Sequence, residues 1–315
     1  MQIGKGRLAL SKLKENEMSE IGFIGLGRMG QSMALNMARK GFKLAIYDIK
    51  DDAMKPFTEF NNCRQASNAN DTIRPGTIII TVLPGPAEVE EVILSKGGIL
   101  DAMPKGTLLM DMSTVLPETT DKIAKEAKLR GCYFVDAPIG RLAQHADSGE
   151  SLFMVGAEDE AFETVKPALE AMGTTILRCG GPGTGTRTKL INNYLVLSSV
   201  QMNSEAIALT QRFGLDLETT LRVIHGTTAT NGQLKINFAS KVFKNDIEPG
   251  FSIDLAHKDM SLIIESANKG KIPMPIAAST RESMSLARAN GWGSKDFSAL
   301  ADFWCEMSKV KKARL

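Results

Sequence analysis

The chain has 315 residues, of which 43% are hydrophobic and 23% charged, and this composition is ordinary for a globular protein. Lys and Arg number 38 against 36 Asp and Glu, so the net charge of +2 and the lack of a long basic run argue against a nucleic-acid-binding function. No run reaches the roughly 18 apolar residues that a membrane span requires, whereas the length is enough for two cores.

Residues 1–20 are polar and rich in Lys, and their apolar core, Leu8–Leu10, is too short for a secretory signal. The first strand-like run begins at Ile21, shortly after Met18. We therefore interpret residues 1–20 as a flexible leader or a misassigned start, and we favour a start at Met18.

From Ile21 onward, short apolar runs bounded by turn residues alternate with amphipathic segments. The runs expected to be strands are Ile21–Ile24, Leu44–Tyr47, Thr77–Leu83, Leu108–Asp111, Tyr133–Val135, Leu152–Val155 and Thr175–Leu177. The segments expected to be helices are Gln31–Lys40, Ala87–Leu94, Glu118–Leu129 and Glu160–Met172. This alternation indicates βαβ units and a mainly parallel sheet that is covered on both faces.

The strand signal ends at a Gly/Pro cluster, residues 180–183, which marks a domain boundary. A long apolar-periodic run without Pro or Gly follows over Thr186–Phe213 and predicts a helix that joins two domains. Further helices are expected at Leu217–Ile224, Asp254–Ala267 and Ile276–Ala289. We therefore predict a doubly wound α/β domain over residues 21–182 and an all-helical domain over residues 183–315, which holds the substrate and an oligomer interface.

Residues 25–30 read GLGRMG, a G-x-G-x-x-G pattern between a predicted strand and a predicted helix. Gly25 permits a tight turn, Gly27 lets the backbone approach a pyrophosphate, and Gly30 lets helix and strand pack closely. The helix N-terminus then faces the phosphates. The pattern predicts a Rossmann-type dinucleotide-binding domain with Gly25, Gly27, Arg28, Met29 and Gly30 at the cofactor; the alternative is a turn that merely needs glycine.

Asp48 ends the second predicted strand. An acidic residue at this position accepts a hydrogen bond from the ribose 2′-hydroxyl and repels a 2′-phosphate, so it favours NAD over NADP. Lys50 weakens the argument because a nearby cation could accommodate a phosphate, and an exposed turn aspartate is the alternative interpretation.

Lys189, Asn192 and Asn193 share one face of the long predicted helix because they are three and four residues apart. Reduction of a carbonyl needs such a cluster of donors, since an acid must protonate the oxygen while hydride reaches the carbon. A solvated surface would show the same spacing.

The four cysteines are widely scattered, which favours a reducing, cytoplasmic compartment; they are Cys63, Cys132, Cys179 and Cys305. The three histidines have no partners at metal-ligand spacing, so no metal is expected; they are His145, His225 and His257. The Met29, Met33 and Met37 stripe has helical spacing and indicates core packing.

Four segments together resemble the β-hydroxyacid dehydrogenase family, and the resemblance extends over Ile21–Ala299. They are residues 25–30, Asp111–Thr114, Gly183–Gly185 with Lys189 and Asn193, and Lys258–Asp259. The resemblance implies that Lys189 donates the proton. It implies cofactor contacts at Leu83, Pro84, Thr114 and Lys258, and substrate contacts at Ser113, Asn192, Asn193 and Val196.

One segment departs from the common family pattern. After residues 136–138, most members carry Ser-Gly-Gly, whereas this chain has Ile139-Gly140-Arg141. Arg141 places a guanidinium fork where a carboxylate cradle is usual, and such a fork suits a strongly anionic oxyacid. An ion pair between Arg141 and a neighbouring acid is the alternative. The Gly140-Arg141 variant resembles the branch of the family that reduces a sulfonated aldehyde.

The resemblance therefore implies NADH-dependent reduction of 3-sulfolactaldehyde to 2,3-dihydroxypropane-1-sulfonate by a homodimer or homotetramer, with neither nucleic acid nor membrane as a partner. A reductase of succinic or tartronate semialdehyde, or a 3-hydroxyisobutyrate dehydrogenase, is the nearest alternative. A non-catalytic NAD-binding protein is an alternative of another class, against which Lys189 speaks. Imine reduction is a third, but relatives with that activity usually lack the lysine.

Overall fold

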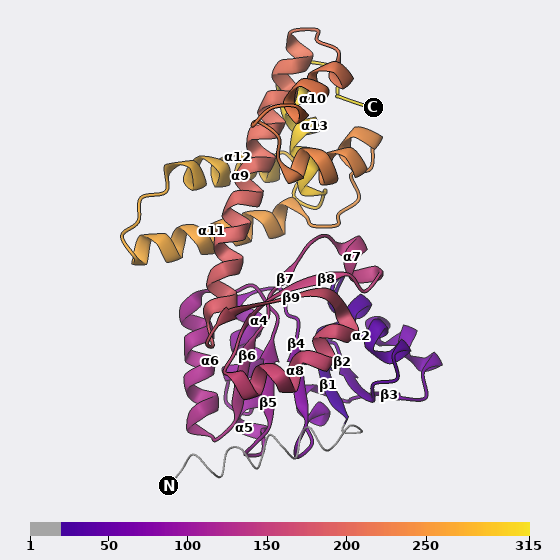
Figure 1. Ribbon diagram of the computed structural model, residues 1–315, viewed down its shortest axis with the longest axis vertical. Coiled ribbons are helices and arrows are strands. Elements are labelled where there is room, and N and C mark those ends of the chain that lie inside the picture. Colours follow the sequence, from indigo (N-terminus) through magenta and orange to yellow (C-terminus); the bar gives the residue numbers. More distant parts are fainter. Residues whose placement is uncertain (1–19) are drawn as a thin grey trace. The chain divides into compact units, whose positions relative to one another are not determined.

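The computed structural model of the chain describes residues 20–315 and divides it into two compact units. Unit 1 ends at Lys189, and unit 2 comprises Leu190–Leu315. The division falls inside helix α9 (Thr184–Arg212), a few residues beyond the boundary predicted at residues 182–183 (Figure 1). Residues 1–19, which hold nearly all of the predicted leader, lie outside the described part.

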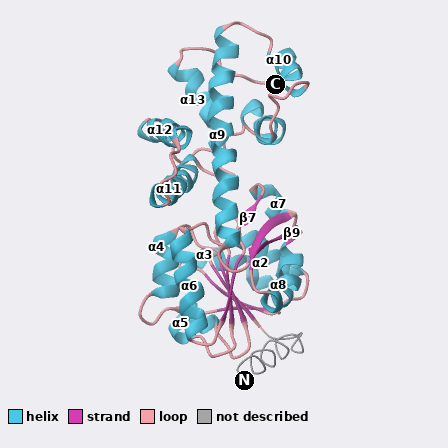
Figure 2. Ribbon diagram, turned by 60° about the vertical axis from the view of Figure 1, so that its left-hand side comes forward, coloured by secondary structure: helices cyan, strands magenta, loops and turns pink. Residues whose placement is uncertain are grey.

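Unit 1 is built on a nine-stranded sheet with the order β3-β2-β1-β4-β5-β6-β8-β7, and β9 pairs with β8 (Figure 2). The strands are β1 (Ile21–Ile24), β2 (Leu44–Tyr47), β3 (Cys63–Gln65), β4 (Ile78–Thr81), β5 (Leu108–Asp111), β6 (Tyr133–Asp136), β7 (Ile139–Gly140), β8 (Ser151–Gly156) and β9 (Gly173–Gly180). The pairs β6–β8 and β7–β8 are antiparallel and the others are parallel. The order of β3 to β6 is that of a doubly wound dinucleotide-binding sheet, so the predicted fold class is confirmed.

Helices cover both faces of this sheet. They are α2 (Gly30–Arg39), α3 (Asp51–Met54), η1 (Lys55–Glu59), η2 (Ala69–Thr72), α4 (Pro86–Val89), η3 (Glu90–Leu94), α5 (Ile99–Ala102), α6 (Pro117–Leu129), α7 (Ala143–Asp147) and α8 (Asp159–Met172). Pro86 and Pro117 occupy the first helical position, where proline loses no hydrogen bond. The single helix predicted over Ala87–Leu94 is divided into α4 and the π-helical turn η3.

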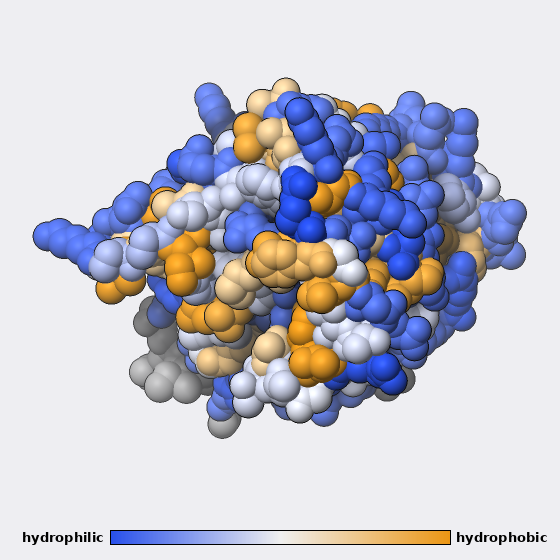
Figure 3. All heavy atoms as spheres, turned by 90° about the horizontal axis from the view of Figure 1, so that it is seen from above, coloured by the Kyte–Doolittle hydropathy of each residue, from blue (hydrophilic) through white to orange (hydrophobic). Residues whose placement is uncertain are grey.

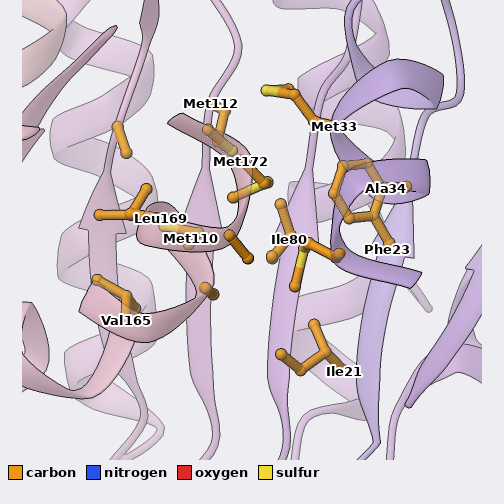
Figure 4. Packing of buried hydrophobic residues seen from close by; sticks show 14 of the residues in the cluster. Ile21, Phe23, Met33, Ala34, Ile80, Met110, Met112, Val165, Leu169 and Met172 are labelled. Atoms are coloured by element: carbon orange, nitrogen blue, oxygen red, sulfur yellow. The ribbon is translucent and has the colours of Figure 1, made fainter. Parts of the chain in front are cut away.

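Successive strand residues pack into two cores, one on each face of the sheet. The side chains of Phe23, Ile80 and Met110 lie on the face of the sheet that α2 and α8 cover (Figure 4). The side chains of their strand neighbours Ile79 and Leu109 lie on the opposite face. This alternation buries both faces and explains why the strands are continuously apolar. The methionines at positions 33 and 37 are fully buried in the first core, as their spacing predicts.

Unit 2 is helical. Its elements are most of α9, α10 (Leu217–His225), η4 (Gln233–Phe238), η5 (Val242–Lys244), α11 (Ile253–Lys269), α12 (Pro275–Ala289), η6 (Phe297–Ala299) and α13 (Leu300–Met307). Side chains cap three of them: Asp216 accepts from the Thr219 N–H, Ser252 from the Leu255 N–H, and Asp296 from the Ser298 N–H. The strands end at Gly180 within the described chain, apart from one isolated bridge, so the predicted helical second domain is confirmed.

Two short strands were not predicted from the sequence. Strand β3 has three residues, all partly or fully exposed, and β7 has two residues. Runs this short carry no periodicity, so only their pairing with β2 and β8 identifies them as strands. Over residues 20–315, no helix combines the length and the apolar character needed to cross a membrane.

Candidate functional site

The loops after β1 and β4 lie side by side at the carboxyl end of the parallel sheet. These two strands are neighbours although β2 and β3 separate them in the chain, so the strand order reverses between them. Ligands of open α/β sheets bind at such a switch point. The loop after β1 is the GLGRMG segment, and the loop after β4 contains Leu83 and Pro84.

The glycine loop has the shape that a dinucleotide needs. Gly25 adopts φ +93°, and a Cβ there would overlap the Val82 carbonyl oxygen. A Cβ on Gly30 would likewise overlap the carbonyl oxygen of Gly25, so loop and helix α2 touch closely. A Cβ on Gly27, in contrast, would have nothing within 4 Å, because this exposed residue faces open space. The residues therefore fit a pyrophosphate that approaches the backbone at Gly27.

Asp48 is half-buried beside this loop. Its Oδ2 accepts a hydrogen bond from the Leu26 N–H at 2.6 Å, and its Oδ1 accepts one from the Lys50 N–H at 2.8 Å. A carboxylate has about four acceptor positions, so two backbone bonds leave room for ribose hydroxyls. The glycine loop and the acidic residue thus hold each other in place.

Arg28 and Met29 have protein partners in this structure. The Arg28 guanidinium pairs with Asp147 of α7 through two hydrogen bonds of 2.7 and 2.6 Å, and Ser32 donates to the same carboxylate. Arg28 lowers the pKa of the Asp147 carboxyl. Met29 packs against the core. The Arg28 side chain can therefore contact a cofactor only after it separates from Asp147, whereas the Arg28 backbone can do so without that change.

Ser113 joins the loop after β4 to the end of β5. Its hydroxyl donates to Asp111 Oδ1 at 2.6 Å and accepts from the Leu83 N–H at 2.9 Å. Asp111, which is 3% exposed, also accepts from Thr81, and burial raises its pKa. Ser113 is itself buried, and its hydroxyl connects the Leu83 backbone to Asp111; its predicted contact with the substrate stays a prediction. Thr114, the next residue, is half-buried.

Lys189 lies against strand β7. Its Nζ donates to the Ile139 carbonyl oxygen at 2.6 Å, and the side chain is half-buried. Gly140, the other residue of β7, is buried and pairs with Leu152 of β8. The fold therefore brings the predicted proton donor to the segment predicted to bind the anionic end of the substrate, which lies about 50 residues earlier in the chain.

Arg141 follows β7 in a left-handed conformation with φ +69°. Its Nη1 donates to the Glu150 carbonyl at 2.6 Å and to Thr174 Oγ1 at 3.2 Å, and its Nη2 donates to Thr175 Oγ1 at 2.9 Å. These bonds use at most three of the five guanidinium donors. The side chain is exposed, and the alternative of an acidic partner is not what the structure shows.

A chain of polar side chains in unit 2 connects helices α9 and α11. Asn192 donates to Asn193 Oδ1 at 3.2 Å, and Asn193 Nδ2 donates to Asp259 Oδ2 at 2.6 Å. Lys258 Nζ lies 2.7 Å from Asp259 Oδ1. Asp259, 2% exposed, thus joins a predicted substrate residue to a predicted cofactor residue. Sequence reasoning did not assign it a role, although it stands in the Lys-Asp motif. Val196, one turn beyond Asn192, is half-buried.

The remaining titratable groups add no metal site among residues 20–315, where no cluster of three His, Cys, Asp or Glu side chains is placed to hold an ion. All four cysteines are free thiols. Burial raises the pKa of Cys63 to about 11, so this thiol is a weak nucleophile.

Two family models together match nearly the whole described chain. Residues 20–181 match the NAD-binding domain of 6-phosphogluconate dehydrogenase. Residues 183–304 match a model described as NAD-binding of NADP-dependent 3-hydroxyisobutyrate dehydrogenase.

Individual relatives are similar over the same length. The 3-sulfolactaldehyde reductase of Escherichia coli K12 is 35% identical over 285 residues, which are 90% of this chain and 95% of the relative. The 2-(hydroxymethyl)glutarate dehydrogenase of Eubacterium barkeri is 33% identical over 291 residues, covering 92% and 96%. The structure of Mycobacterium tuberculosis 3-hydroxyisobutyrate dehydrogenase with L-serine is 25% identical, covers 91% of this chain and 99% of its own, and superposes with a TM-score of 0.81.

Proposed function

We propose, from the premise that the chain belongs to the β-hydroxyacid dehydrogenase family of oxidoreductases, that it reduces 3-sulfolactaldehyde to 2,3-dihydroxypropane-1-sulfonate with NADH. Bound NADH supplies the hydride that reaches the aldehyde carbon. The observation that supports the proposal is the contact between Lys189 and Ile139, because Ile139 belongs to strand β7, which Arg141 follows in the chain.

Lys189 is the proposed proton donor. Its ammonium releases one proton to the carbonyl oxygen as the carbon accepts hydride, so the aldehyde becomes a primary alcohol. Positioned proton transfer of this kind contributes about 10²–10⁴-fold to a rate. The bond to the Ile139 carbonyl restricts the direction of the ammonium group.

Arg141 is the proposed partner of the sulfonate. Its bonds to Thr174, Thr175 and Glu150 hold the guanidinium on the surface beside β9, and two N–H donors remain. A sulfonate stays ionised at any working pH and offers three equivalent oxygens, so it can accept both donors in parallel. Gly140, the buried residue before Arg141, is the proposed backbone contact of the same sulfonate.

The asparagines of α9 are the proposed orienting groups. Asn193 is fixed by Asp259 and is 5% exposed, whereas Asn192 is exposed and donates to Asn193. We assign substrate contact to both, with Val196 as the adjacent apolar surface and Lys258 as a cofactor contact. The ion pair with Asp259 orients Lys258.

The proposed preference for NADH over NADPH is supported by Asp48. Its carboxylate is fixed by the Leu26 and Lys50 N–H groups, so it cannot turn away from a 2′-phosphate without losing both bonds. Lys50, whose side chain could attract a phosphate, is exposed. The Leu83, Pro84 and Thr114 residues are the proposed contacts along the rest of the nucleotide.

We propose that the enzyme is a homo-oligomer assembled through unit 2. A stripe of large apolar side chains follows one face of α9 and continues to the residue after it, and each of them is at least half exposed: Ile191 66%, Leu195 60%, Met202 55%, Leu209 52% and Phe213 65%. The stripe is about 33 Å long at 1.5 Å per residue. A second copy of the chain would cover such a stripe. Figure 3 views the molecule from above and shows a different face, on which apolar residues lie among hydrophilic ones.

The test compares kcat/KM for 3-sulfolactaldehyde, succinic semialdehyde and tartronate semialdehyde on wild type, Arg141→Lys and Arg141→Ala. Charge-assisted hydrogen bonds contribute about 1.5–3 kcal/mol each, so Arg141→Ala should lose roughly 10–100-fold for the sulfonate substrate. Arg141→Lys keeps the charge but lacks the fork and should lose part of that. The matched control is Arg178→Ala. Arg178 lies on β9, the strand that also carries Thr174 and Thr175, and its guanidinium pairs with Asp159 of α8, so its removal should leave the substrate preference unchanged.

The nearest alternative substrate is a semialdehyde that carries a carboxylate, because two of the relatives are named for hydroxy acids. A wild-type preference for either carboxylate substrate, or an equal loss on all three aldehydes in Arg141→Ala, would refute the sulfonate assignment. A non-catalytic NAD-binding protein would show no NADH oxidation with any of the three substrates.

A further inference from the structure

Helix α9 begins without a capping side chain of its own. The residue before its first turn is Gly183, and the first four N–H groups of a helix have no partner inside the helix. Asp136, at the end of β6, supplies the missing acceptors from 47 residues upstream. Its Oδ1 accepts from the Gly183 N–H at 2.6 Å, and its Oδ2 accepts from the Thr186 N–H at 2.7 Å.

The surrounding backbone is shaped to this carboxylate. Asp136 is 1% exposed. A Cβ on Gly156 would overlap Asp136 Oδ1, and a Cβ on Gly185 would lie 3.0 Å from Oδ2. Any side chain at position 156 would therefore push the carboxylate off the helix. A buried charge is costly, and the partial positive charge of a helix N-terminus offsets that cost.

The same short segment also holds the end of Lys189. Asp136 fixes the backbone at Thr186, and Lys189 follows three residues later on the helix. The Ile139 carbonyl, three residues after Asp136, accepts from Lys189 Nζ at 2.6 Å. Residues 136–139 thus contact both the start of helix α9, through Asp136, and the ammonium group of Lys189, through the Ile139 carbonyl.

We propose that Asp136 is a positioning residue for Lys189, through which it acts on the reaction that the proposed function assigns to Lys189. Other side-chain contacts hold the same turn of α9, and one of them also reaches the backbone, because Arg187 donates to the Gly183 carbonyl oxygen at 3.0 Å. Thr120 and Thr186 pair through their hydroxyls at 3.1 Å. Arg187 pairs with Asp121 on the surface, where both side chains are about half exposed, and such pairs contribute little.

The test is a double-mutant cycle of Asp136→Asn and Lys189→Ala. Asn keeps the size of Asp but turns an amide N–H toward one of the two backbone N–H groups, so the helix start shifts. Displacement of a catalytic group by about 1 Å can cost about 10²-fold, and we expect Asp136→Asn to lower kcat by about 10–100-fold with the KM for NADH unchanged. In the Lys189→Ala background the same substitution should lower turnover less than twofold.

Asp121→Asn, which removes the surface ion pair to the same helix turn, is the matched control and should keep near-normal kcat in both backgrounds. Gly156→Ala displaces the carboxylate without removing it and should repeat the Asp136→Asn pattern. Each variant is checked by thermal melting and NADH titration.

Additive losses would overturn the positioning role, because a general structural defect lowers turnover whether or not Lys189 is present. A loss of NADH binding together with turnover, or a failure of both variants to fold, would overturn it as well, since the carboxylate would then support unit 1 as a whole. Near-normal turnover of Lys189→Ala alone would instead refute the proposed function, so the two failures are distinguishable.

Discussion

Replacing Asp48 by serine tests the cofactor assignment directly. In wild type the Asp48 carboxylate accepts hydrogen bonds from two backbone N–H groups, at N···O distances of 2.6 and 2.8 Å, and is half-buried beside the glycine loop. Serine removes the negative charge and one acceptor oxygen, and it is small enough to leave space for a 2′-phosphate.

The magnitude follows from the position of the charge. Two unit charges about 4 Å apart repel by about 1 kcal/mol in water and about 4 kcal/mol at an effective dielectric constant of about 20. A half-buried group lies between these limits, so we expect about 2–3 kcal/mol, which corresponds to a preference of about 30- to 150-fold for NADH. Asp48→Ser should remove most of that preference. It should also raise the KM for NADH about 10-fold, because the ribose loses a charged acceptor.

The assay is kcat/KM for NADH and NADPH at saturating aldehyde, on wild type, Asp48→Ser and Asp52→Ser. Asp52 stands on α3 and pairs with Lys55 on the surface, so its replacement makes the same change in net charge a few residues away. The reasoning is refuted if wild type uses NADPH as well as NADH, or if Asp52→Ser shifts the ratio as much as Asp48→Ser does.

Two further predictions concern unit 2. Asp259→Asn should lower kcat/KM about 10-fold or more, because Asn193 and Lys258 lose their shared carboxylate; the outcome against it is normal kinetics in a variant that melts like wild type. A double substitution Met202→Glu and Leu209→Glu on the α9 stripe should lower the mass measured by light scattering, whereas Val223→Glu, at an exposed position on α10, should not; an unchanged oligomer in the first variant would exclude the stripe as the interface.

Much of the fold could be predicted because burial on both faces leaves a plain signal. Strands β1, β2 and β5 begin and end where the apolar runs do. Strand β7 could not be predicted, since two residues carry no period and pairing with β8 comes from the tertiary fold. The same holds for η3, where a π-helical turn continues α4 without any break in the apolar spacing.

The backbone conformation of the candidate site could be predicted where a local motif determines it. The hydrogen-bond partners of its side chains could not, because they come from distant parts of the chain. The GLGRMG loop has the predicted turn, because Gly25 and Gly30 leave no room for a Cβ. The partners of Arg28 and Ser113 could not be predicted, since Asp147 and Leu83 meet them only after the sheet is assembled. Arg141 likewise finds Thr174 and Thr175 because β9 pairs with β8.

Four aspartates share one role, because each fixes another residue of the candidate site. Asp48 holds the glycine loop, Asp111 holds Ser113, Asp136 holds the start of α9, and Asp259 holds Asn193. Asp111 and Asp136 are direct partners on neighbouring strands, and each is buried and bonded to N–H or O–H groups. The proposed anionic substrate and a dinucleotide both favour cationic and neutral donors at the surface they touch, so Asp111, Asp136 and Asp259 are best placed one step behind that surface, whereas Asp48 is the proposed contact of the ribose. Substitution of Asp111, Asp136 or Asp259 should therefore act through the residue it holds, and the effect should vanish when that residue is removed.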